Sequence, residues 1–129
     1  MISILLREIE ETISLSSIVI SSDVKKYFSA SKKEVYIKGL LIFMDMSSLE
    51  FSVFVLEKGK KLIFDKYRYQ YMDNKKKLVF RYDNASHHRD IPTFPRHKHL
   101  EDGKVMESAI PKFHEVLEEI STVIVQSFS

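Results

Sequence analysis

Four histidines stand close together in the second half of the chain, as His87-His88 and His97-x-His99. Imidazole titrates at about pH 6.5, so it can both give and take a proton at neutral pH. Two imidazoles beside a phosphodiester, with a cation to hold the developing charge, suffice to cleave RNA through its own 2′-hydroxyl without a metal ion. We therefore select His88 and His99 as the candidate acid and base, with His87 and Asp83 as candidate orienting groups.

Two other roles for these histidines stay open. Histidine clusters also bind metal ions, and His97 and His99 would form a ligand pair on an extended strand. The chain has no cysteine and no HExxH spacing, so it lacks a recognised metal motif, and its isolated glycines form no phosphate-binding loop. We predict no cofactor and no metal ligand. A structural or interface role is the further alternative, and His114, which stands alone, is interpreted as structural.

The candidate substrate-binding residues are mostly cationic. If Phe80 and Tyr82 pack in the core, Arg81 points to the opposite face of its strand, where Arg68 from the neighbouring strand can join it. Two guanidinium groups on one sheet face would form a phosphate cradle, whereas a cross-strand salt bridge with Asp65 or Glu50 is the alternative. The full candidate set is Arg68, Arg81, Tyr82, Asn84, Arg96 and Lys98.

Tyr67, Tyr69 and Tyr71 alternate along one predicted strand and therefore share a face. If these rings are exposed, they form a stacking platform for single-stranded bases. If they are buried, they are ordinary residues of the hydrophobic core. We favour the core for all three.

The net charge of +2 conceals an asymmetry along the chain. From Lys58 to Lys98 there are twelve Lys or Arg residues and four Asp residues, a formal charge of +8, while the remainder carries a formal −6. A basic central segment between acidic ends indicates a polyanionic partner for one surface. For the lysine triplet 75–77 alone, solvation of a hairpin tip is the simpler explanation.

Length and composition indicate one globular domain over residues 1–129, because 44% of the residues are hydrophobic and 29% charged. Charged residues from Arg7 to Glu11 interrupt the apolar core that a signal peptide would need. No apolar run approaches the roughly 20 residues that span a bilayer. We therefore expect a cytoplasmic protein that does not enter a membrane.

Two amphipathic helices are predicted at the ends of the chain, because apolar residues recur there at three- and four-residue spacing. Between them, alternating residues and short turns predict neighbouring antiparallel strands. Residues 84–110 show neither period, so we expect an irregular loop rich in His and Pro there. The sequence predicts an α+β domain: an antiparallel β-meander of four to five strands with an N-terminal and a C-terminal helix packed on one face.

Several stretches between Lys66 and His99 form a long and specific pattern: YRYQYMD, LVFRYDNA, HH, IPTFP and HKHL, followed by a final helix with EVLEEI. This pattern resembles the TumE family of toxins from toxin–antitoxin modules. The chain departs from it at Ser86, where proline is expected, and at Arg96, where histidine is expected. Arg96 keeps a positive charge but cannot shuttle a proton. The resemblance implies a small intracellular protein encoded beside a helix-turn-helix antitoxin that neutralises it.

The leading hypothesis is a toxin that targets RNA as a metal-independent endoribonuclease. The ribonuclease chemistry comes from the residues themselves, with the analogy that many such toxins attack RNA. The alternatives are a non-catalytic module that binds nucleic acid or protein, and a metal-dependent hydrolase. Expected partners are RNA and the helix-turn-helix antitoxin. A homodimer contact or core packing would each explain the apolar tail, which comprises Val123, Ile124, Val125 and Phe128.

Overall fold

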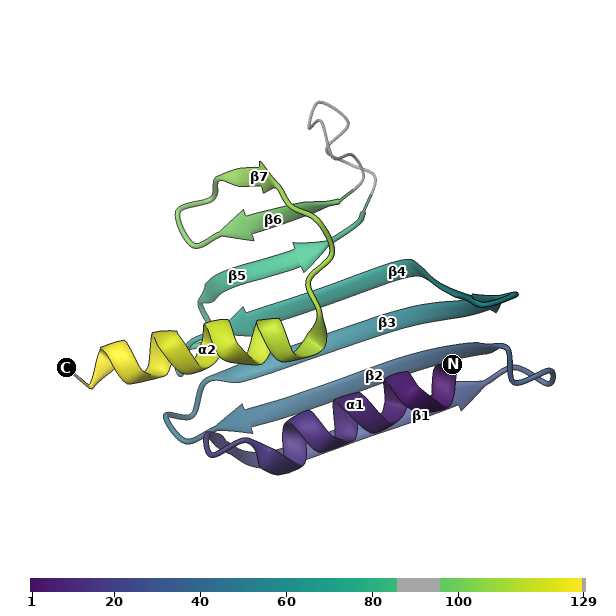
Figure 1. The fold of residues 1–129 in the computed structure, drawn as a ribbon. Coiled ribbons are helices and arrows are strands. Elements are labelled where there is room, and N and C mark those ends of the chain that lie inside the picture. The colour runs from purple at the N-terminus through teal and green to yellow at the C-terminus, as the bar shows by residue number, and fades with distance from the viewer. Residues whose placement is uncertain (86–95, 129) are drawn as a thin grey trace.

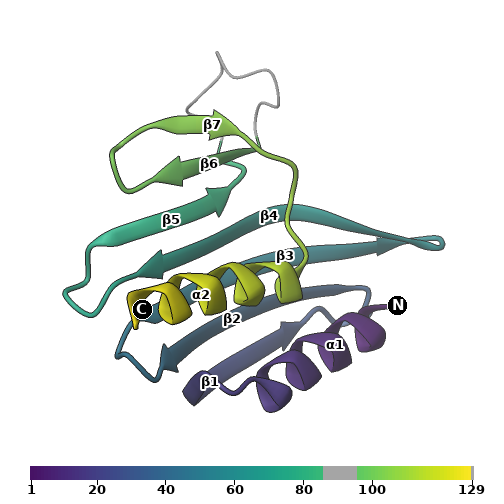
Figure 2. The ribbon, with the colours of Figure 1, turned by 60° about the vertical axis from the view of Figure 1, so that its left-hand side comes forward.

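The computed structural model describes residues 1–85 and 96–128. These residues form one antiparallel sheet of seven strands, in which strands adjacent in the chain are also adjacent in the sheet. One helix precedes the sheet and one follows it, and both lie on the same face (Figures 1 and 2). The elements are α1 (Ile2–Leu15), β1 (Val19–Phe28), β2 (Glu34–Phe43), β3 (Ser48–Lys58), β4 (Lys61–Met72), β5 (Leu78–Asp83), β6 (His97–Leu100), β7 (Val105–Glu107) and α2 (Phe113–Ser127).

The predicted α+β class is confirmed, as is the meander with both helices on one face, but four to five strands were too few. The irregular loop expected over residues 84–110 is corrected in its second half, which contains β6 and β7. These strands have four and three residues, too few to show a period, and the buried positions of β6 are histidines rather than apolar residues. β1 shows no alternation of buried and exposed residues for a different reason, because nearly all its side chains are exposed.

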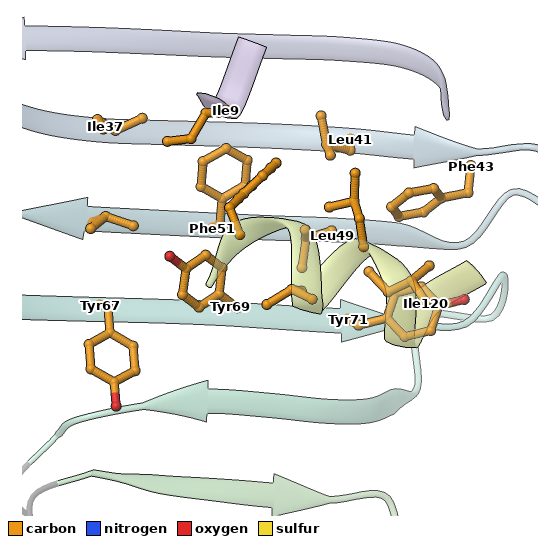
Figure 3. Packing of buried hydrophobic residues seen from close by; sticks show 14 of the residues in the cluster. Ile9, Ile37, Leu41, Phe43, Leu49, Phe51, Tyr67, Tyr69, Tyr71 and Ile120 are labelled. Carbon is orange, nitrogen blue, oxygen red and sulfur yellow. The ribbon is translucent and has the colours of Figure 1, made fainter. Parts of the chain in front are cut away.

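The core lies between the sheet and the two helices. Alternate residues of β2 and β3 are almost fully buried, as expected for strands with one covered face. Ile9 of α1 and Ile120 of α2 close this layer from the helix side. Figure 3 shows its main side chains, which include Ile37, Leu41, Phe43, Leu49, Phe51, Tyr69 and Tyr71.

The three alternating tyrosines of β4 belong to this core, which confirms the favoured interpretation. Tyr67, Tyr69 and Tyr71 are 5%, 3% and 1% exposed. The Tyr71 hydroxyl donates to Oγ of Ser47 at 2.9 Å, so its polar end is satisfied inside the protein. Burial raises the pKa of Tyr69 and of Tyr71, because a phenolate would lose its hydration there. These rings are therefore not a base-stacking platform.

Within residues 1–85 and 96–128, the opposite face of the sheet carries no helix, and we call it the helix-free face (Figures 1 and 2). Cross-strand pairing aligns its side chains in rows that run across the strands. We call one of these rows the cation row; it consists of Lys25, Lys38, Ser52, Arg68, Asp83 and His97. The neighbouring row consists of Asp23, Leu40, Glu50, Gln70, Arg81 and His99.

Among the described residues, no helix is long and apolar enough to cross a membrane.

Gly39 of β2 makes room for a core aromatic ring. A Cβ atom at this position would lie 2.3 Å from Cζ of Phe51, its cross-strand partner. The Phe51 ring cannot easily move, since it is 3% exposed and its centroid lies 5.0 Å from that of Phe113 on α2. The absence of a side chain at Gly39 is thus a packing requirement of the helix-covered face.

Gly39→Ala is expected to lower the free energy of unfolding by about 1–3 kcal/mol, the usual cost of overpacking a core. The cost should shrink when Phe51 is first replaced by Leu, because the clashing ring atoms are then gone. Equilibrium urea unfolding of the four proteins of this cycle measures both values. An equal cost of Gly39→Ala in the two backgrounds would contradict the packing explanation.

Candidate functional site

A compact polar cluster is centred on Asp83 at the end of β5. Its carboxylate lies 3.1 Å from Nε of Arg81 and 3.5 Å from Nε2 of His99, and it also forms an ion-pair contact with Nε2 of His97. Asp83 is 6% exposed, so water screens these interactions only weakly. We call Asp83, Arg81, His97 and His99 the Asp83 cluster.

Strand geometry brings the Asp83 cluster together. Arg81 and Asp83 stand two residues apart on β5 and therefore project from the same face. Their cross-strand partners on β6 are His99 and His97, which are also two residues apart. Side-chain alternation and the pairing of two short strands thus suffice to bring these four side chains together on the helix-free face.

The two histidines of the cluster differ in exposure. His97 is fully buried, whereas His99 is 9% exposed. Their rings meet edge to face with centroids 4.7 Å apart. A large dissolved substrate can therefore touch His99 but not His97, whose contact with Asp83 makes it a positioning group.

Arg68 and Arg81 share one acceptor on the helix-free face. Nη1 of Arg81 donates to Oε1 of Gln70 at 3.2 Å, and Nη2 of Arg68 donates to the same oxygen. Arg68 is also the cross-strand partner of Asp83 in the register of β4 with β5. The prediction that the two arginines lie together on the face opposite Phe80 is confirmed, and the arrangement can bind an anion between them.

Lys98 and Tyr82 lie on the other side of the sheet, contrary to the expectation that they join His99 in binding substrate. Nζ of Lys98 lies 2.8 Å from Oε2 of Glu119 on α2, and the Tyr82 hydroxyl donates to Oε1 of the same carboxylate at 2.6 Å. Burial alone would lower the pKa of Lys98, but its bonds to Glu119 and Tyr82 outweigh burial and raise it. This trio holds α2 against β5 and β6.

Asn84 and Arg96 flank the cluster. The Asn84 amide donates to the carbonyl of Asp65 at 2.9 Å and accepts from the N–H of Tyr67 at 3.0 Å, so it continues the ladder between β4 and β5. Arg96 immediately precedes β6 and is exposed. Burial raises the pKa of Tyr67 to about 12, an effect that the positive charge of Arg96 opposes. The structure thus places Arg96 near the Tyr67 hydroxyl and engages the Asn84 side chain with backbone groups.

The remaining histidines divide into two groups. His87 and His88 lie outside the described residues. His114 is exposed on α2, where Nδ1 lies 3.1 Å from Oε1 of Glu118. Sequence reasoning did not include His97 and Gln70 among the site residues, although the two-residue spacing of His97 from His99 and of Gln70 from Arg68 places each on the same strand face.

The Asp83 cluster also contains a set of atoms that suits a divalent metal ion. One ligand atom from each of Asp83, His97 and His99 lies within 4.8 Å of the others. A carboxylate with two imidazoles is a recurrent ligand set for zinc and iron. Arg81 competes with any metal, because its guanidinium already faces the same carboxylate.

Comparison with known proteins connects the chain to a family. A protein-family model described as Toxin TumE matches residues 6–125. The match begins inside α1, ends inside α2 and spans every residue of the Asp83 cluster. No curated protein and no solved structure matches the chain.

Asp83→Asn is expected to lower the free energy of unfolding by an amount on the order of 3 kcal/mol, because removal of one partner leaves buried basic groups without a counter-charge. Denaturant unfolding at neutral pH measures this loss. Glu118→Gln is the matched control, since it removes an exposed carboxylate that contacts a histidine and should cost no more than about 0.5 kcal/mol. Equal stability of the two variants would show that Asp83 does not hold the cluster.

A double-mutant cycle of Lys98→Met and Glu119→Gln is expected to give a coupling of about 1 kcal/mol, because the pair is only partly exposed. Since the pair raises the pKa of Lys98 above 10.5, this coupling is present below that pH and is lost as the pH rises through the shifted value. The same cycle at Lys104 and Asp102, an exposed pair, should give almost no coupling. Equal couplings at the two sites would refute the anchoring role.

Proposed function

The chain belongs to the TumE toxin family, and we propose on this basis that it is the toxin of a toxin–antitoxin module that cleaves RNA without a metal ion. Family membership supports the toxin role, while the RNA target and the chemistry are proposed from the site. The observation that carries them is the convergence of a buried carboxylate, an imidazole that is 9% exposed and two arginines on one sheet face.

His99 is the proposed general base. The negative charge of Asp83 faces Nε2 of His99 and favours the tautomer with its proton on that nitrogen. A neutral His99 then carries its lone pair on Nδ1, which takes the proton from a ribose 2′-hydroxyl. The 2′-oxygen attacks the adjacent phosphorus. His97 acts indirectly, because it is buried and holds Asp83 from the inner side.

Arg81 and Arg68 are the proposed phosphate-binding residues. Charge builds up on the non-bridging oxygens as the 2′-oxygen attacks, and guanidinium groups fixed in advance stabilise that charge more than they stabilise the bound substrate. Gln70 fixes both groups in advance, because each donates to its side-chain oxygen. Arg96 lies at the same end of the sheet and is proposed as a further contact to RNA. Asn84 is a candidate RNA contact only through the part of its side chain that its bonds to the backbone of Tyr67 and Asp65 leave accessible.

The leaving 5′-oxygen needs a proton, and His88 is the proposed donor, with His87 as its orienting neighbour. Both lie outside the described residues, so this assignment rests on the sequence pattern. The balanced step breaks the bond from phosphorus to the 5′-oxygen and forms one from the 2′-oxygen to phosphorus. Its products are a 2′,3′-cyclic phosphate and a 5′-hydroxyl end, and no water is consumed.

A metal-dependent hydrolase is the second candidate function, favoured by the grouping of Asp83, His97 and His99. In that case Asp83 and the two imidazoles would hold the metal, and the metal would supply Lewis-acid activation of a water molecule. A third candidate, a module that binds RNA or protein without chemistry, uses the same basic surface. It predicts binding that weakens steeply with salt and no loss of intact RNA.

Partners follow from the proposed role. The family implies an antitoxin, and we propose that it contains a helix-turn-helix domain and acts with this chain in the cytoplasm. A homodimer is also proposed, through the end of α2. Val125 and Phe128 there are 61% and 67% exposed, whereas Ile124 is part of the core. Val123 packs against that core as well, so the apolar tail serves the core with two residues and leaves two for contact with another chain.

His99→Gln is expected to reduce the rate of RNA cleavage by about 10²–10⁴-fold, because glutamine retains polar contacts but cannot shuttle a proton. The assay uses a fluorescent single-stranded RNA, and circular dichroism verifies that each variant is folded. His114→Gln, on the outer surface of α2, is the matched control and should cleave like the parent protein. Parent-like cleavage by folded His99→Gln would remove the proposed base.

Chelation separates the two catalytic candidates. The proposed mechanism predicts that the parent protein cleaves RNA at the same rate before and after treatment with EDTA. Loss of cleavage in EDTA, followed by recovery with a single divalent ion, would instead support the metal-dependent hydrolase.

A further inference from the structure

The helix-free face of the sheet contains a groove over β1 to β4 that leads to the Asp83 cluster. Its volume is ≈ 530 Å³, and Arg68 of β4 lines it at the end nearest to β5. Arg68 shares the Gln70 oxygen with Arg81, so the groove and the cluster meet at this residue. We call this feature the β1–β4 groove; its lining includes Lys25, Tyr27, Tyr36, Lys38, Glu50 and Arg68.

We propose that the β1–β4 groove binds single-stranded RNA and presents its phosphodiester backbone to the Asp83 cluster. The inference rests on the proposed ribonuclease function and adds the path and the strandedness of the substrate. Two independent features of the groove support it: a line of cations and a pair of exposed stacked aromatic rings.

The cations follow the direction that leads to the cluster. Lys25, Lys38 and Arg68 occupy the cation row, which continues directly to Asp83. Neighbouring strands lie about 4.8 Å apart, so these three side chains span roughly 14 Å of sheet. Within the described part of the chain, neither lysine forms an ion pair, and both are exposed. A phosphate backbone along this row gains attraction at three successive points.

Acidic side chains restrict the RNA to one side of the groove. Asp23 and Glu50 also line it, but they belong to the neighbouring row, where Leu40 separates them. Phosphates placed over the β1 to β3 part of that row would be repelled by these two acids, whereas the far end of the row carries Arg81 and His99. The charge pattern therefore orients the backbone along the lysines, with the bases directed away from the acids.

Tyr27 and Tyr36 provide the second feature. These cross-strand partners are 53% and 38% exposed, and their rings stack with centroids 6.1 Å apart and planes inclined by 28°. Each stands two residues from a lysine of the cation row on its own strand. Phe54 of β3 is the next cross-strand partner of Tyr36. Both residues line a second hollow, which extends to Lys66. Exposed rings beside a line of cations are the usual platform for single-stranded bases.

Single-stranded rather than duplex RNA fits this arrangement. In a duplex the faces of the bases are stacked on one another and are not available to tyrosine rings. An isolated strand can place a base on Tyr36 while its phosphates contact the lysines. A segment of the antitoxin is the competing occupant of this face, and the experiment below distinguishes it.

The test measures fluorescence anisotropy of a single-stranded 2′-O-methyl oligonucleotide, which lacks the attacking hydroxyl and remains intact. Tyr36→Ala is expected to weaken binding by about 5- to 150-fold, the value of one stacked base. A Lys25→Ala, Lys38→Ala double variant should reduce the slope of log affinity against log salt by about 1.4. The matched control is Lys60→Ala, Lys61→Ala, at the β3–β4 hairpin, with an expected change of less than twofold.

The outcomes separate this inference from the proposed function. Weaker binding by the groove variants and not by the hairpin control supports the path, whether or not unmodified RNA is cleaved. Unchanged binding by both groove variants overturns the path, while cleavage by the parent protein would still support the proposed function. Preferential binding of an RNA duplex, or loss of antitoxin binding alone in the groove variants, also overturns it.

Discussion

A single buried carboxylate, that of Asp83, holds together the polar cluster at β5 and β6. Burial of a charge is costly unless partners surround it, and Asp83 is surrounded by a guanidinium and two imidazoles. The two buried histidines need it in return, because they would otherwise be buried basic groups without a counter-charge, and the partly buried Arg81 gains a counter-charge from it as well. β6 has only four residues, two of them buried histidines, so little apolar burial fastens it to β5. The charge cluster supplies that attachment and builds the site at the same time.

The two faces of the sheet differ in role: one packs against the helices, and the other carries the proposed site. Lys98 and His99 are adjacent in the chain, yet the alternation of a strand sends them to opposite sides. Lys98 binds Glu119 and fastens α2, while His99 faces Asp83 beside the arginines. The helices cover one face completely enough to bury the β4 tyrosines, and neither of these two helices lies on the other face.

Much of this fold follows from sequence patterns, and the exceptions have physical reasons. Long strands with one covered face alternate clearly, which is why Arg81 and Arg68 could be placed together in advance. β6 could not be recognised as a strand from the sequence, because its two buried residues are histidines that contact Asp83 rather than apolar residues. Lys98 was grouped with its histidine neighbours by composition, although strand geometry separates them. The stack of Tyr27 on Tyr36 depends on the register of β1 with β2, which the nearly fully exposed β1 does not reveal.

The chemical identity of the RNA ends tests the central claim most directly. Purified protein is incubated with a single-stranded RNA of known sequence in EDTA, and the products are analysed by mass spectrometry. Attack by the 2′-hydroxyl, with His99 and Asp83 as described, predicts 2′,3′-cyclic phosphate ends and 5′-hydroxyl ends. Ends with a 5′-phosphate and a 3′-hydroxyl would require water as the nucleophile and would contradict the account, as would RNA that stays intact.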